Sequence, residues 1–206
     1  MTQATESDIR AQLAEIRDRQ KISDLVLDYC RGVDRLDDAL LRSTYWPDAI
    51  DNHGVRDENA MVFCDRVLPL LREHATSTMH LVANCRLELN GDHASGETYV
   101  VAYHVLKSAR SLDTFVGPDA AQQIRAGFPD AEAEAPFEYH AGARYLDRFE
   151  RRGGEWRIAY RGLVFEWTQA HPASVSLGLL ARARGRRDAS DASYAVLSGA
   201  PNASAL

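Results

Sequence analysis

The chain has 206 residues, of which 45% are hydrophobic and 26% charged, and these values suit one globular domain with a full core. Its formal net charge is −6, so it lacks the concentrated positive surface that binding to nucleic acid requires, and an anionic membrane should repel it. The expected partner is therefore a small molecule or another protein.

Nothing in the sequence indicates export or membrane insertion. No apolar run approaches the roughly 20 residues that a membrane-spanning helix needs, and the polar start MTQATESDIR does not resemble a signal peptide. The three cysteines are scattered and odd in number, which gives no disulfide framework. We therefore expect a cytoplasmic protein.

The first third of the chain is predicted to be helical. Apolar residues at the three-and-four spacing of an amphipathic helix continue from a cap at Ser7 to Val33. The pattern breaks near Asp37, a short apolar stretch follows and ends at Pro47, and a second helical pattern spans residues 60–73.

From Thr78 onward the apolar period changes to two, which predicts strands. The predicted strands cover residues 78–89, 96–106, 143–152 and 155–167. Asn90-Gly91 joins the first pair and Gly153-Gly154 the second, and both dipeptides are strong turn signals. Two antiparallel hairpins after a helical start indicate an α+β fold, in which a curved antiparallel sheet wraps the N-terminal helices.

Two segments do not fit this plan. Residues 108–139 are too long for a hairpin turn and contain an acidic, Ala-rich run, so we interpret them as an insert that could cover a site. The predicted organisation is one domain over residues 1–170, with this insert at about 108–139, and a C-terminal extension over residues 171–206.

Motifs for phosphate, dinucleotide or zincin-type metal binding are absent. The chain has no GxGxxG, no GxxxxGK[ST], no HExxH and no CxxC, and its seven histidines are never two or four residues apart. We therefore expect no metal and no cofactor. A metal held by His53, His80 and His104 with Asp34 stays open, because only the fold decides whether these residues meet.

Asp34 is the first candidate for chemistry. It lies at the end of the first helical pattern, about 80° around the helix from Val26 and at the margin of the apolar stripe, whereas Asp24 falls on the opposite face. A half-buried carboxylate needs a partner. The alternative is a capping or surface acid.

Two strand histidines are the candidate partners. His80 lies in the first predicted strand and His104 in the second. A carboxylate bonded to one imidazole nitrogen fixes the tautomer and makes the other nitrogen a better general base. Tyr29 and Tyr145 could hold a developing negative charge. For each of these residues, an ordinary hydrogen-bonded or packing role in the core is the alternative.

Three stretches together resemble the SnoaL-like branch of the NTF2-like superfamily, over roughly residues 10–170. They read YCRGVDRLDDALLRSTYWPDAIDNHG, STMHLVANCRLELNGDHASGETYVVAYH and GARYLDRFERRGGEWRIAYR. The resemblance implies a cone-shaped α+β barrel, a homotrimer, and an Asp–His dyad like that of the scytalone-dehydratase-like enzymes of this superfamily.

Carried over residue by residue, the resemblance makes Asp34 and His80 the dyad and His104 a second catalytic histidine of the pocket. Tyr29, His53, Tyr145 and Arg144 are expected to bind substrate. His53 and Tyr145 depart from the scytalone-dehydratase pattern, which has a tyrosine and an amide there, and these departures argue against a simple dehydration of that kind.

The function predicted from these residues is a cofactor-independent lyase. The Asp–His base would eliminate water, halide or a small carbon fragment, the last by retro-aldol-type cleavage, from a small hydrophobic molecule such as a hydroxylated aromatic or polycyclic compound. Two alternatives remain. One is an isomerase or cyclase that uses the same base, and the other is a non-catalytic small subunit of a ring-hydroxylating dioxygenase.

Overall fold

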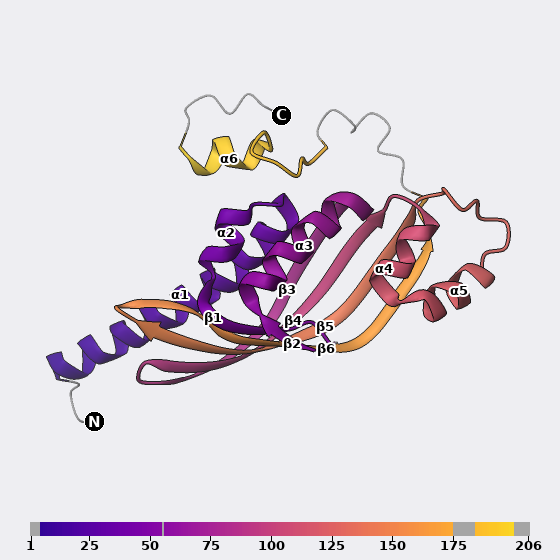
Figure 1. Cartoon of the computed structure of the whole chain (residues 1–206). Coiled ribbons are helices and arrows are strands. Elements are labelled where there is room, and N and C mark those ends of the chain that lie inside the picture. Colours follow the sequence, from indigo (N-terminus) through magenta and orange to yellow (C-terminus); the bar gives the residue numbers. More distant parts are fainter. Residues whose placement is uncertain (1–4, 55, 175–183, 200–206) are drawn as a thin grey trace.

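A computed structural model describes residues 5–54, 56–174 and 184–199. It confirms the α+β plan: a curved six-stranded sheet carries α1, α2 and α3 on one face, and α4 and α5 lie at one end of it (Figure 1). The strand order is β2-β1-β6-β5-β4-β3. The elements are α1 Glu6–Arg35, α2 Asp38–Ser43, β1 Tyr45–Asn52, β2 Asp57–Asn59, α3 Ala60–His74, β3 Ala75–Asn90, β4 His93–Leu106, η1 Ala109–Ser111, α4 Leu112–Val116, α5 Pro118–Ala126, β5 Phe137–Arg152, β6 Glu155–Pro172 and α6 Ala192–Leu197.

The long helix α1 begins two residues before the predicted start. Thr5, not Ser7, is its cap, because the Thr5 side chain accepts the backbone N–H of Asp8 and the Asp8 carboxylate accepts the backbone N–H of Thr5. The helix ends where Leu36 turns into the left-handed region with φ 53°. This stop leaves Asp34 in the last turn, close to the sheet.

Both predicted hairpins are present, with strands longer than the sequence pattern indicated. β3 pairs antiparallel with β4 around Gly91, and β5 pairs antiparallel with β6 around Gly153 and Gly154. All three glycines have positive φ, which a residue with a side chain adopts less easily. β4 and β5 also pair antiparallel, so the two hairpins form one continuous sheet.

Two strands were not predicted: β1, and the short β2 that pairs antiparallel with it. β1 runs parallel to β6, so the sheet is not entirely antiparallel as expected. The short apolar stretch was expected to end at Pro47, but β1 continues past it. The β1–β6 register shifts between Tyr45 and Ile50, and this irregularity accommodates the proline. Pairing with the distant β6 on one side and with the short β2 on the other keeps this segment extended.

The insert packs against one end of the sheet. Its helices contribute Leu112 and Ala121 to a small core that also contains Leu106 and Phe137. Because β5 begins at Phe137, the connection between β4 and β5 is slightly shorter than the predicted insert.

The described part of the C-terminal extension returns to α1. Asp191 forms an ion pair with Arg35 at 3.1 Å, and the Tyr194 hydroxyl donates to Asp37 at 2.8 Å. Arg31 also stacks over the Tyr194 ring at 4.6 Å. Within the described residues, no helix combines the length and apolar character needed to cross a bilayer.

The face of the sheet that turns away from the helices carries exposed apolar side chains. Successive residues of a strand point to opposite faces, so the neighbours of His80 and Ala102 point outward. Five outward side chains, between 37% and 51% exposed, are Met79, Leu81, Tyr99, Val101 and Trp167. Such an apolar face is unusual for a monomer in water.

Candidate functional site

A cavity of about 380 Å³ lies between the helices and the sheet. Its walls are mainly apolar, with contributions from α1, α3, α4 and the four long strands. The apolar lining residues are Val33, Phe63, Val67, Leu70, Leu71, Val100, Ala102, Phe115, Ala141, Ala143, Leu163 and Phe165. A cavity with these dimensions and walls suits a small, largely apolar molecule.

Asp34 and His80 meet at the wall of this cavity. The His80 Nδ1 atom lies 2.7 Å from Asp34 Oδ1, and the backbone N–H of His80 donates to Asp34 Oδ2 at 2.9 Å. Both side chains are about nine-tenths buried, and His80 lines the cavity. The last turn of α1 and the strand β3 therefore bring together the two residues that the sequence singled out.

The environment keeps the Asp34 carboxylate charged. Burial raises the pKa of Asp34, but hydrogen bonds from the side chain and backbone of His80 outweigh burial, so its pKa lies below the usual value. A charged carboxylate accepts the Nδ1–H of His80. The lone pair of the imidazole then lies on Nε2, the nitrogen that a general base needs.

His104 lies beside the dyad, and burial keeps its ring neutral. Its ring centre is 5.7 Å from that of His80, and the two rings are nearly perpendicular. Burial, together with the nearby His80, lowers the pKa of His104 to about 3, so its ring is neutral near pH 7. Its buried Nδ1 has no hydrogen-bond partner among the described residues.

His53 belongs to a second carboxylate–imidazole pair at the same cavity. Its Nδ1 lies 2.5 Å from Oδ1 of the fully buried Asp51, and the Tyr45 hydroxyl donates to Asp51 Oδ2 at 2.6 Å. On its other side, His53 Nε2 lies 3.2 Å from the Tyr29 hydroxyl. The sequence analysis missed Asp51. It lies two residues before His53 at the end of a strand, and residues with this spacing point to the same face.

Tyr29 and Tyr145 both line the cavity, with Arg161 between them. The guanidinium of Arg161 lies 4.0 Å from each ring centre and forms two hydrogen bonds of 2.8 Å with Asp147. Burial raises the pKa of both tyrosines well above the usual value. Their hydroxyl groups therefore stay protonated near neutral pH and can donate hydrogen bonds.

Arg144 is the one predicted substrate contact that the structure places outside the cavity. Its guanidinium lies on the opposite face of β5 and pairs with Glu97 at 2.5 Å and Glu166 at 2.7 Å. The reason is the alternation of side chains along a strand: Tyr145 points inward, so its neighbour points outward. This corrects the expectation that Arg144 contacts the substrate.

The insert contributes to the cavity, as its length suggested. Thr114 and Phe115 of α4 line it, and the Phe115 ring lies 5.2 Å from that of His104. The sequence identified this segment as a cover but did not single out either residue, because a five-residue helix has too little periodicity to reveal an inward face.

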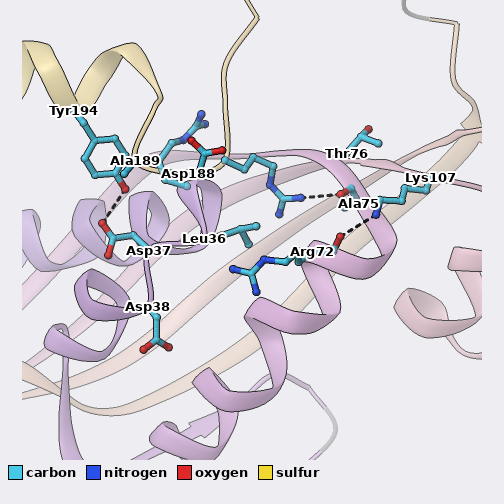
Figure 2. A pocket seen from close by; sticks show the side chains of 12 residues that line it. Leu36, Asp37, Asp38, Arg72, Ala75, Thr76, Lys107, Asp188, Ala189 and Tyr194 are labelled. Carbon is cyan, nitrogen blue, oxygen red and sulfur yellow. Dashed lines mark hydrogen bonds between the residues drawn. The ribbon is translucent and has the colours of Figure 1, made fainter.

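A second hollow, of about 630 Å³, lies where the C-terminal extension passes the ends of α1 and α3 (Figure 2). Charged residues of both signs line it, among them Arg72, Lys107 and Asp188. Figure 2 shows Tyr194 bonded to Asp37 at one side and Lys107 bonded to the Arg72 carbonyl at the other. This charged, open surface does not suit the apolar molecule that the first cavity fits.

Comparison with known proteins identifies the family. The model of the SnoaL-like domain matches residues 14–162. No curated protein matches the chain. A type 2 hexachlorocyclohexane dehydrochlorinase is similar in structure, with 21% identity, a TM-score of 0.59 and coverage of 80% of this chain and 95% of that one.

Two further solved structures are similar. The type 3 hexachlorocyclohexane dehydrochlorinase of Novosphingobium barchaimii has 20% identity and a TM-score of 0.58, over 80% of this chain and 96% of its own. A Novosphingobium aromaticivorans protein described as a scytalone dehydratase has 15% identity and a TM-score of 0.58, over 79% and 97%. At such identities the likeness concerns the fold, which is NTF2-like. The family match itself covers most of the sequence, and the chain belongs to the SnoaL-like domain family.

Proposed function

We propose that the chain is a cofactor-independent lyase in which His80, held by Asp34, removes a proton from a small hydrophobic substrate. The observation that carries this proposal is the two-point contact of Asp34 with His80, through the imidazole at 2.7 Å and the backbone N–H at 2.9 Å, at the wall of an apolar cavity. The elimination needs the removal of a proton and the departure of a leaving group, and neither step requires a cofactor.

The proton is taken by Nε2 of His80. Asp34 accepts the Nδ1–H, which fixes the tautomer before the reaction and stabilises the imidazolium that forms during it. The electrostatic gain is larger in a cavity with apolar walls than in water, because fewer water dipoles screen the pair.

The reaction also needs a hydrogen-bond donor for the leaving group or for the developing negative charge. Three groups of the cavity can supply it. The Tyr29 and Tyr145 hydroxyls stay protonated, and His104 has a neutral ring whose N–H can donate a hydrogen bond. An imidazolium acid at His104 would require a pH near 3, so we assign His104 the role of a neutral hydrogen-bond partner.

The cavity walls support the proposed substrate class. Aromatic side chains at Phe63, Phe115 and Tyr139 and aliphatic side chains around them favour an apolar ring system of a size that fits about 380 Å³. The histidines and tyrosines need a hydroxyl or carbonyl on that ring for their hydrogen bonds. A hydroxylated aromatic or polycyclic compound meets both conditions, and the leaving group would be water, halide or a small carbon fragment.

An isomerase is the second candidate, and one observation favours it. The cavity has two carboxylate–imidazole pairs, His80 with Asp34 and His53 with Asp51. One pair could remove a proton and the other return it elsewhere on the same molecule, without loss of a group. Analysis of the product by mass distinguishes the two, since an isomer keeps the mass of the substrate.

The experiment measures turnover of a panel of hydroxylated aromatic and polycyclic compounds by the purified chain alone, in the presence of a chelator. We expect turnover by the wild type and a loss of about 10²–10⁴-fold in His80→Ala, the range for removal of a general base. Asp24→Asn is the matched control, because Asp24 is an exposed carboxylate on the same helix. Equal rates in the wild type and His80→Ala would contradict the proposed base.

The same purification tests the non-catalytic alternative. A small subunit of a ring-hydroxylating dioxygenase would be inactive alone and would copurify with a larger chain. His104 argues against a purely structural subunit, because its buried Nδ1 has no hydrogen-bond partner among the described residues and such a group costs free energy.

A further inference from the structure

Outside the cavity, three side chains of the types that bind metals gather on the outer face of the sheet. Glu138 and His140 lie two residues apart on β5, and His171 on β6 is the direct strand partner of Glu138. One ligand atom from each of the three lies within 4.8 Å of the others. The intervening Tyr139 points to the cavity, so this cluster lies behind the cavity wall.

The spacing of the ligand atoms is close to that of a tetrahedral metal site. Ligands about 2.0–2.2 Å from a zinc ion are about 3.4 Å from one another in that geometry. Glu138 Oε2 lies 3.3 Å from His140 Nε2 and 3.9 Å from His171 Nε2. The first pair already has the required separation, and a small rotation of the half-exposed His171 ring would close the second.

The tautomer of His171 indicates that a cation belongs between these atoms. Its Nδ1 lies 3.2 Å from the carbonyl oxygen of Pro172, which can only accept, so Nδ1 carries the proton. In the neutral ring, Nε2 then presents its lone pair to the carboxylate of Glu138. Two lone pairs repel unless a cation lies between them. A backbone carbonyl that holds the far nitrogen is also how metal-binding histidines are commonly oriented.

The Glu138 carboxylate is only partly satisfied, since its Oε2 lies within hydrogen-bond distance of His140 Nε2 at 3.3 Å. Its side chain is 9% exposed, and its Oε1 has no hydrogen-bond partner among the described residues. Among the residues that the structure describes, Glu138 forms ion pairs with the two histidines, and no lysine or arginine pairs with it. A buried carboxylate without a compensating positive charge is unfavourable, so a cation at this position would stabilise the folded chain.

We propose that Glu138, His140 and His171 bind one divalent transition-metal ion, for which Zn²⁺ is the test probe. Two imidazoles and one carboxylate suit zinc, cobalt or nickel, whereas magnesium and calcium prefer oxygen ligands alone. Three protein ligands leave a fourth position for water. The ion links the end of β6 to β5, directly behind Tyr139.

The test is a calorimetric titration of the metal-stripped full chain with Zn²⁺. We expect one ion per chain with micromolar or tighter affinity, an increase in Tm on binding, and no heat with Mg²⁺. Glu138→Gln and His140→Ala should each weaken binding at least tenfold. His93→Ala and Cys85→Ser, which remove other exposed ligands, should bind Zn²⁺ like the wild type.

Cobalt provides a second readout that does not depend on the stability of one variant. Co²⁺ at a site with three protein ligands gives visible absorption bands, which Glu138→Gln should lose while its circular dichroism stays that of the wild type. Equal Zn²⁺ binding by Glu138→Gln and the wild type, or no detectable binding of Zn²⁺ by the wild type, would overturn the proposal. The cluster would then be an ion pair between Glu138 and protonated histidines only.

Discussion

The substitution Asp34→Asn tests the dyad without changing the shape of the side chain. In the wild type, one carboxylate oxygen accepts the Nδ1–H of His80 and the other accepts its backbone N–H. Asparagine has one acceptor and one NH₂ group. If its oxygen keeps the backbone N–H, its NH₂ faces Nδ1, and Nδ1 must then become the acceptor. The proton moves to Nε2, and the lone pair of the base is lost.

The loss of that lone pair sets the size of the effect. A histidine base in the wrong tautomer, without an anion to stabilise its imidazolium, should lower kcat by about 10²–10⁴-fold. The fold should be affected much less, because a charge-assisted hydrogen bond contributes about 1.5–3 kcal/mol. For a chain of this length that loss corresponds to a decrease in Tm of roughly 3–12 °C.

The assay therefore measures two quantities on the same variant: turnover of a substrate found in the panel, and Tm by circular dichroism. We expect a folded Asp34→Asn protein at 25 °C with strongly reduced kcat, beside an Asp24→Asn control with the wild-type rate. A folded Asp34→Asn protein with wild-type turnover would refute the assignment of His80 and Asp34 as the base.

Three further results are expected. The first concerns His104, whose pKa is lowered to about 3 in the folded chain. Between about pH 6.5 and pH 3 the unfolded chain binds a proton at His104 and the folded chain does not, so the free energy of unfolding is highest above about pH 6.5 and falls as the pH decreases toward 3. Urea titrations should show that the free energy of unfolding falls by about 2–3 kcal/mol between pH 6.5 and 4.5. His104→Gln should reduce this dependence on pH. An unchanged dependence on pH in that variant would mean that His104 is already charged in the folded state. Asp147→Asn should lower the unfolding free energy by about 3–5 kcal/mol, because it leaves the fully buried Arg161 without its counter-ion, and a change below about 1 kcal/mol in the same urea titration would contradict this. We also propose that the outer apolar face joins three copies of the chain. Light scattering should then give a mass of about three times 22.9 kDa, and Leu81→Asp should give smaller species. A monomeric wild type would exclude the trimer.

The local sequence contained enough information for most of the secondary structure. The glycine turns at Gly91 and Gly153 and the alternation of the long strands depend on neighbouring residues only, and both hairpins form as predicted. β1 was missed because its extended form depends on pairing with β6, more than 100 residues away in the chain. The start of α1 was misplaced by two residues because Thr5 and Ser7 are both of residue types that cap helices.

For the candidate site, too, some features could be predicted from the sequence and others could not. The position of Asp34 at the margin of an apolar stripe, and of His80 and His104 in strands, follows from periodicity in the sequence, with the family resemblance as added support. Their meeting does not: the contact between Asp34 and His80 joins residues 46 positions apart. Only the packing of α1 on β3 sets that distance.

What the sequence by itself determined is which residue types stand on which face of each element, because helical and strand periodicities are local properties of the backbone. Tertiary structure alone decided which faces meet. It joined His53 to the buried Asp51, lowered the pKa of His104, and gathered Glu138, His140 and His171 behind the cavity. Each of these depends on distances and burial between chain segments, and these quantities exist only once the sheet has closed around the helices.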